Sequence, residues 1–188
     1  TGGLVGEYCT GIGGAEEFGA RGSEGGEVLW AQQLGARLAN RQAYQGYAAV
    51  AYPHGSLLSW TTIEKGGFLV NASGKRFGNE DLGYSAYARE VLAQQSNVYA
   101  LFDERIMNLA SKEDEFRELV DIGGLKHGQS VEELAAAFGW PADVLARTFA
   151  DYNAAAAGER ADPLGRKRFQ MAPLTGRLWM CRVTPGLF

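Results

Sequence analysis

The chain has few cysteines, no excess of positive charge and no long apolar segment. Only two of its 188 residues are cysteines, Cys9 and Cys181, which are too few for a disulfide framework and too far apart for a zinc motif. Its 18 basic and 22 acidic residues are interspersed, so no basic stripe is available for nucleic acid. No apolar run approaches the roughly 20 residues of a membrane helix, and no signal-peptide pattern starts the chain. We therefore expect reduced cysteines, no metal site, no nucleic-acid or membrane partner and a cytoplasmic protein.

A dinucleotide-binding fingerprint is also missing, although glycine is abundant. Ten of the 26 glycines fall within the first 26 residues. None of them forms a G-x-G-x-x-G sequence between a strand and a helix. The chain also begins at Thr1 without an initiator methionine and ends at Phe188 without a polar tail. These features predict a segment of a longer protein.

Hydrophobic residues make up 46% of the chain, and their spacing alternates between helical and extended patterns. It predicts helices from Ser23 to Gly35 or Asn40, over 84–95, about 104–110, about 112–120, 130–138 and 141–157. It predicts extended segments over 42–52, 66–77, 97–103 and 177–183, with turns at 53–55 and 126–128 and a polar loop over 159–176. The predicted fold class is α+β, a small mixed sheet with helices packed on it.

The most informative stretch runs from Gly66 to Glu80, with the sequence GGFLVNASGKRFGNE. Three apolar residues from Phe68 are followed by a turn at 71–74 and by a second extended piece, which predicts a hairpin. Arg76 and Glu80 are predicted to form an ion pair that holds this hairpin. The stretch resembles the hairpin that opens the substrate-capping domain in the fumarate reductase and succinate dehydrogenase flavoprotein superfamily, which also contains the 3-ketosteroid dehydrogenases.

Four further stretches resemble the same superfamily in the same order along the chain. They are Thr1 to Gly3, Gly22 to Ala36, Ser130 to Asn153 and Asp162 to Arg166. The resemblance implies FAD as the cofactor of the full-length protein, a dinucleotide-binding half before Thr1, and loss of FAD from this chain alone. The FAD contacts that it implies are Thr1, Gly2, Gly3 and Gly25. It divides the chain into a partial flavin-domain segment (1–50), a capping domain (51–176) and a returning strand (177–188).

The resemblance also implies which residue transfers the proton. Fumarate reductases place an arginine four residues after the motif glutamate, where this chain has Tyr84. Where they place a Thr-Glu pair and a second arginine, this chain has Ser59, Trp60 and Ile63. The 3-ketosteroid dehydrogenases instead carry a tyrosine near the position of Tyr84, which implies proton transfer by its oxygen. An unperturbed phenol has a pKa of about 10, so this role requires a stabilised anion, for example at a helix start.

Three residues are predicted to bind substrate: His54, Tyr87 and Arg89. Each has a structural alternative, because tyrosines at 84 and 87 also suit a packed aromatic face and Arg89 also suits a pair with Glu90. The predicted function is hydride and proton transfer across a C–C bond next to a carbonyl or carboxylate, with a small-molecule substrate and the missing FAD-binding domain as partners. Di- or tricarboxylates and steroids remain alternative substrates, and a non-catalytic α+β binding module remains an alternative function.

Overall fold

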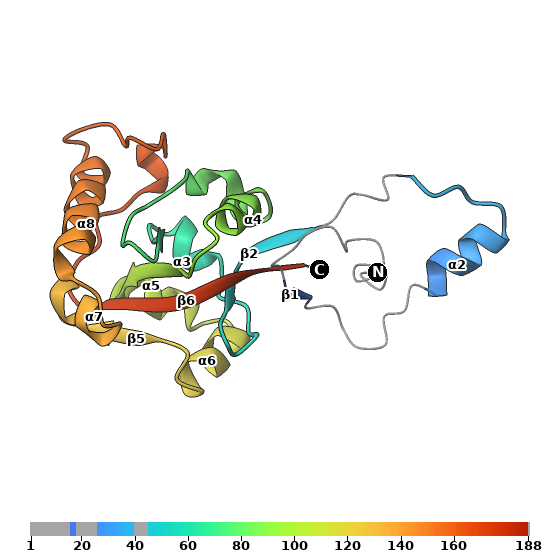
Figure 1. Ribbon diagram of the computed structural model, residues 1–188, viewed down its shortest axis with the longest axis horizontal. Coiled ribbons are helices and arrows are strands. Elements are labelled where there is room, and N and C mark those ends of the chain that lie inside the picture. The colour runs from blue at the N-terminus through green and yellow to red at the C-terminus, as the bar shows by residue number, and fades with distance from the viewer. Residues whose placement is uncertain (1–15, 18–25, 40–44, 188) are drawn as a thin grey trace.

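The computed structural model describes residues 16–17, 26–39 and 45–187. In these ranges a six-stranded sheet forms the centre of the molecule (Figure 1). Its strands are β1 (Glu16–Glu17), β2 (Gly46–Ala51), β3 (Phe68–Asn71), β4 (Val98–Asp103), β5 (Lys126–Gly128) and β6 (Leu178–Leu187). The path β1-β6-β4-β3 forms the sheet, and β2 and β5 also pair with β6. Only β1 pairs in parallel, so the sheet is mixed and the predicted α+β class is confirmed.

Strand β4 lies at the centre of the core. It pairs antiparallel with β3 on one side and with β6 on the other, and all six of its residues are buried. Its sequence is a continuous apolar run that ends in Asp103, as expected for a strand covered on both faces. Asp103 then caps the next helix, because its Oδ1 accepts a hydrogen bond from the Ile106 amide at 3.0 Å.

The helices match the sequence pattern closely over the described ranges. They are α2 (Gly26–Gln33), α3 (Thr61–Glu64), α4 (Gly83–Ala93), α5 (Glu104–Ala110), α6 (Asp114–Asp121), α7 (Val131–Ala137) and α8 (Ala142–Ala157), with 3-10 turns η1 (Glu80–Leu82) and η2 (Arg168–Gln170). Ser130 caps α7 by accepting from the Glu133 amide at 3.3 Å. Pro141 caps α8 rather than opening its first turn, and Gly158 ends it at a φ of 83°. The short helix α3 was not predicted.

Two local predictions are wrong. Residues 75–77 do not form the second strand of a hairpin, because β3 pairs with β4 instead and Arg76 turns inward to two buried carboxylates. His127 does not lie in a turn. It lies in β5 opposite Trp179 of β6, with the two rings 4.8 Å apart, and is exposed as predicted. In both cases a distant partner decides the local conformation.

Helix α2 lies apart from the sheet in Figure 1, and none of its residues is buried. Leu29 and Trp30 are 51% and 67% exposed, and Leu34, just past the helix end, is 89% exposed. The predicted cap Ser23 lies outside the described residues. Within the described residues, the apolar side chains of α2 are therefore not buried against another element.

Cys181 is a buried free thiol on β6, whereas Cys9 lies outside the described residues. Among the described helices none is both long and apolar enough to cross a bilayer. No group of three or more metal-ligating side chains is found in the ranges 16–17, 26–39 and 45–187.

Candidate active site

Tyr84 lies in the first turn of α4, four residues after Glu80. Gly83 joins η1 to α4 at a φ of 77°, a conformation that suits glycine because a Cβ would be strained there. The Tyr84 side chain is left 38% exposed. The unsatisfied amides and the positive end of the helix dipole lie at this turn, a setting that favours negative charge nearby.

Two further aromatic rings surround Tyr84. The ring of Tyr47, from β2, lies 5.0 Å from the Tyr84 ring at 34° to it. Trp60, just before α3, stands at 74° to both tyrosine rings, at 6.4 Å from Tyr84 and 6.5 Å from Tyr47. These distances are typical of stabilising aromatic pairs. The three rings therefore form a corner that fixes how Tyr84 is presented.

This corner opens into a cavity of about 260 Å³, which we call the Tyr84 pocket. Its lining residues are Tyr47, Leu57, Ser59, Trp60, Thr61, Glu64, Tyr84, Glu113, Glu115 and Phe116. Polar side chains on its wall are linked to one another: Ser59 and Thr61 donate hydrogen bonds from Oγ and Oγ1 to Glu113 Oε1, at 2.8 and 3.0 Å. The Tyr84 pocket thus combines an exposed phenol, an aromatic wall and an oriented carboxylate.

Tyr47 contributes a protonated phenol to the pocket. Its hydroxyl donates to the Leu58 carbonyl at 2.9 Å. Burial raises the pKa of Tyr47, and the charges of Glu113 and Glu64 raise it further. Tyr47 therefore stays neutral at physiological pH and serves as a packing and orienting group.

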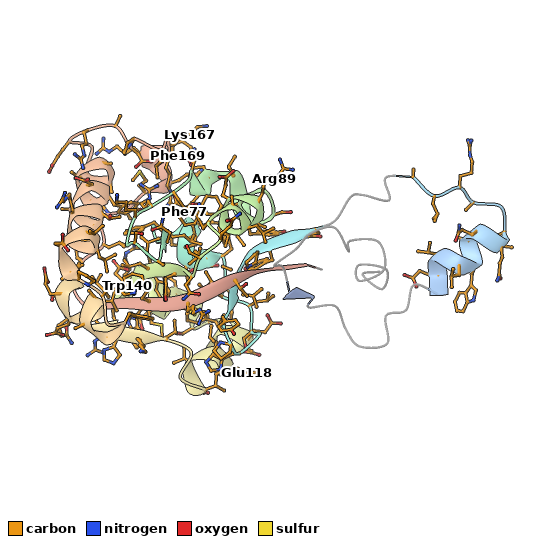
Figure 2. The ribbon with its side chains drawn as sticks, viewed as in Figure 1. Phe77, Arg89, Glu118, Trp140, Lys167 and Phe169 are labelled. Atoms are coloured by element: carbon orange, nitrogen blue, oxygen red, sulfur yellow. The ribbon has the colours of Figure 1, made fainter. Side chains whose placement is uncertain are left out.

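The other predicted substrate contacts lie elsewhere. Tyr87 is fully buried, with its ring 6.2 Å from that of Trp60 and 5.5 Å from that of Phe77, and its hydroxyl has no hydrogen-bond partner among the described residues. His54 is exposed in the turn after β2, and Arg89 projects outward from α4 (Figure 2). None of the three lines the Tyr84 pocket. Their substrate-binding roles stay predictions.

Tyr47 and Glu113 were missed by the sequence analysis. Tyr47 lies in β2 and Glu113 lies just before α6, and neither segment contains a motif of the superfamily. Only the fold brings these two residues to Tyr84. Ser59 and Trp60 stand at positions that the resemblance had marked, so a motif signal pointed to this wall of the pocket. No local signal in the sequence could have added Glu113 to it.

A buried ion network supports the turn that precedes Tyr84. Arg76 Nη2 lies 2.6 Å from Glu80 Oε2, which confirms the predicted pair. Asp162 accepts from Arg76 as well, and Arg166 Nη1 lies 3.7 Å from Glu80. The backbone amide of Leu69 donates to Glu80 Oε1 at 3.3 Å. Glu80 is therefore held from three directions, which fixes where α4 starts.

A larger cavity of about 560 Å³ lies between α8 and the loop at 162–164. Three basic and three acidic side chains line it: Lys75, Arg76, Arg147, Asp143, Asp151 and Asp162. Arg76 and Asp162 pair with each other, and Asp151 pairs with Arg160. It contains no predicted site residue and has no excess charge, so we regard the smaller Tyr84 pocket as the functional candidate.

Comparison with known proteins assigns the family. The model of the FAD binding domain family matches residues 3–186, so the chain belongs to this family. The chain is 37% identical over 112 residues to a fumarate reductase of Schizosaccharomyces pombe, covering 58% of this chain and 21% of that protein. It is 26% identical over 158 residues to the fumarate reductase (cytochrome) of Shewanella frigidimarina, covering 84% and 27%. The chain thus spans about a quarter of the length of these relatives.

Solved structures show the same fold. A flavocytochrome c3 fumarate reductase in its open conformation superposes with a TM-score of 0.73 at 24% identity, covering 98% of this chain and 32% of that one. The 3-ketosteroid-Δ4-(5α)-dehydrogenase of Rhodococcus jostii RHA1 gives a TM-score of 0.63 at 26% identity, covering 98% and 37%. The predicted superfamily is thereby confirmed.

FAD is the cofactor of this family, as predicted. The predicted contacts Thr1, Gly2, Gly3 and Gly25 lie outside the described residues and stay predictions. Next to them, Gly26 opens α2, and a Cβ there would meet only the Trp30 ring at 4.0 Å. No FAD contact is therefore assigned within the described residues, and the chemistry proposed below is that of their side chains.

Proposed function

We propose that the full-length protein is an FAD-dependent oxidoreductase acting on a C–C bond next to a carbonyl or carboxylate, and that residues 51–176 form its substrate cap. The family match over residues 3–186 supports the flavoprotein assignment and counts against a non-catalytic module. FAD, when bound, supplies hydride chemistry to such enzymes. The cap then contributes the proton and the shape of the pocket.

In this proposal Tyr84 exchanges the proton with substrate. The observation that carries it is the position of Tyr84, at the start of α4 and partly exposed on the aromatic wall of the Tyr84 pocket. A general acid or base must reach the substrate, and the partly exposed phenol of Tyr84 can do so. Tyr47 and Trp60 hold the ring in place and keep water from one side of it.

Fumarate is not the substrate that we propose. Tyr84 and Ile63 stand where the resemblance places arginines in fumarate reductases, and Trp60 stands in place of a glutamate. A small dicarboxylate is recognised by paired cations, which this wall of the pocket does not supply. An unsaturated ketone, or the saturated ketone in the reverse direction, suits the phenol and the aromatic corner better.

The test is Tyr84→Phe in the full-length protein, with flavin reduction by substrate followed in the absence of oxygen. Loss of general acid–base catalysis should slow reduction by about 10²- to 10⁴-fold while FAD remains bound. Tyr52→Phe is the matched control, because Tyr52 is also 38% exposed but packs on Arg182 away from the pocket. An unchanged rate and pH profile in Tyr84→Phe would exclude this residue as the proton carrier.

A further inference from the structure

All charged side chains that line the Tyr84 pocket are acidic. They are Glu64, Glu113 and Glu115, and no lysine, arginine or histidine is among the lining residues. None of the three glutamates forms an ion pair with any residue in the described part of the chain. All three are exposed, so water screens their charge, but together they give the cavity a negative potential. Such a potential attracts a cation and repels a carboxylate.

Glu113 is oriented as well as charged. Both neighbouring hydroxyls, those of Ser59 and Thr61, donate to the same oxygen, Oε1. Its second oxygen, Oε2, makes no hydrogen bond within the described ranges. The hydroxyls thus hold the carboxylate in one position and leave one oxygen for a ligand.

The aromatic wall has the same preference. The faces of Tyr47, Trp60 and Tyr84 carry negative quadrupole charge, and a cation over such a face is stabilised. Trp60 stands at 74° to the other two rings, so ring planes of two orientations border the corner. Charge and ring geometry are independent observations, and both favour a positive group.

The side chains that could have received a carboxylate are elsewhere. His54 and Arg89 were the candidates for that role, and neither lines the Tyr84 pocket. Ile63, at a position that the resemblance marks for arginine, is buried in the core. The described lining of the Tyr84 pocket therefore repels an anionic substrate and holds no cation to compensate.

We infer that the Tyr84 pocket selects a substrate with a positively charged group, an ammonium-bearing unsaturated ketone or its saturated counterpart. The inference rests on the proposed function, in which Tyr84 faces the reacting carbons. The ammonium lies against the aromatic corner and Glu113 Oε2, and the unsaturated carbonyl end lies toward Tyr84. The volume of about 260 Å³ suits a small molecule.

The experiment uses the full-length holoprotein and three matched unsaturated ketones. They are identical except for a far end that is trimethylammonium, tert-butyl or carboxylate. The first two ends have the same shape, so a difference between them reports charge alone. Binding is measured by quenching of tryptophan fluorescence, and turnover is measured separately by flavin reoxidation.

We expect the trimethylammonium compound to bind about three- to thirtyfold more tightly than the tert-butyl compound, as expected for cation–π and carboxylate contacts. The carboxylate compound should bind most weakly. Glu113→Gln keeps an acceptor for Ser59 and Thr61 but removes the charge, so it should lower the cation preference by about two- to fivefold. Glu118→Gln, at an exposed position on α6 outside the pocket (Figure 2), should leave the preference unchanged.

Equal binding of the two isosteric compounds, tighter binding of the carboxylate, or no saturable binding of the cation would each overturn the inference. An unchanged preference in Glu113→Gln would do the same. Failure of the proposed function has a different signature: the cation binds selectively, but Tyr84→Phe turns it over as fast as the unaltered protein. The binding and turnover measurements thus separate the two proposals.

Discussion

The guanidinium of Arg76 joins Glu80 to Asp162, which lies 86 positions after Arg76 in the chain. Its nitrogens lie 2.6 Å from Glu80 Oε2 and 2.5 Å from Asp162 Oδ1, and all three side chains are at most 6% exposed. Arg166 completes the group by donating to the carbonyls of Gly67 and Ile63 at 2.7 and 2.6 Å. Two motifs that are distant in the sequence therefore meet in one buried network, which ties the loop over 159–176 to the turn before α4.

Arg76→Met should strongly destabilise the protein. It removes the shared cation and leaves Glu80 and Asp162 as buried charges close together, which costs about 3–5 kcal/mol of unfolding free energy. Arg160→Met is the matched control, because Arg160 pairs with Asp151 on the surface, where both side chains are about half exposed. Its loss should cost about 1 kcal/mol or less. Denaturant unfolding measures both, and similar losses would show that the network adds no more than a surface pair.

Gly67→Ala should also destabilise the protein, for a steric reason. A Cβ at Gly67 would lie 2.3 Å from the Thr62 carbonyl oxygen and 2.9 Å from that of Leu101. Both are backbone atoms, so strand β4 or helix α3 must move, at a cost of about 2–4 kcal/mol.

Gly123→Ala provides the comparison, because Gly123 has a φ of 77° but no atom within 4 Å of an added Cβ. Backbone strain alone should cost about 1–2 kcal/mol there. Thermal unfolding of the two variants separates close approach from backbone conformation. Equal shifts in melting temperature would contradict the steric explanation.

The elements that the sequence predicted well are those set by local pattern. Helices α4 and α8 follow the spacing of their buried residues, and β4 follows its apolar run. The extended piece over 75–77 was predicted wrongly because its conformation depends on Asp162, which lies far away in the sequence. The assignment of β5 failed for the same reason, since three residues around His127 become a strand only because β6 is available beside them.

The residues of the candidate site also fall into those that the sequence could predict and those that it could not. Tyr84 could be predicted because it is counted from a motif, and Ser59 and Trp60 because the resemblance marks their positions. Glu113 could not, since nothing near it in the sequence relates it to Tyr84. Tyr87 shows the opposite case. Helical spacing predicts that it lies beside Tyr84, but the Tyr87 side chain is buried in the core and does not line the pocket.

Tyr87→Phe should leave stability unchanged or raise it slightly. The Tyr87 hydroxyl is buried and has no hydrogen-bond partner in the described ranges, so removing it abolishes a desolvation cost of about 1–3 kcal/mol without breaking a hydrogen bond seen there. Tyr152→Phe is the matched change, since the Tyr152 hydroxyl is equally buried but donates to the Gly66 carbonyl at 2.6 Å. Tyr152→Phe should lower the unfolding free energy by about 0.5–1.5 kcal/mol, because it leaves the Gly66 carbonyl without this donor. Unfolding free energies that fall equally in both would contradict this account.

The buried thiol of Cys181 should make the protein less stable at alkaline pH. Burial raises the pKa of the Cys181 thiol to about 12, whereas an exposed thiol has a pKa of about 8.5. Between these values the unfolded chain releases the proton and the folded chain retains it. Ionisation of this thiol therefore leaves the unfolding free energy unchanged below about pH 8.5. Above that pH it lowers the unfolding free energy by about 1.4 kcal/mol per pH unit.

Cys181→Ala removes this contribution while Cys9 remains in both proteins, so the difference in unfolding free energy between the two reports Cys181 alone. Burial raises the pKa of Tyr47, Tyr87 and Tyr152 as well, but these phenols act equally in both proteins and only above about pH 10. The unfolding free energy of the unaltered protein should thus fall relative to that of Cys181→Ala by about 1.4 kcal/mol for each pH unit above about 8.5. Denaturant unfolding at pH 7, 8, 9 and 10 measures it. If the unfolding free energies of the two proteins changed with pH in parallel, the thiol would ionise as easily in the folded protein as in the unfolded chain. That result would contradict the prediction.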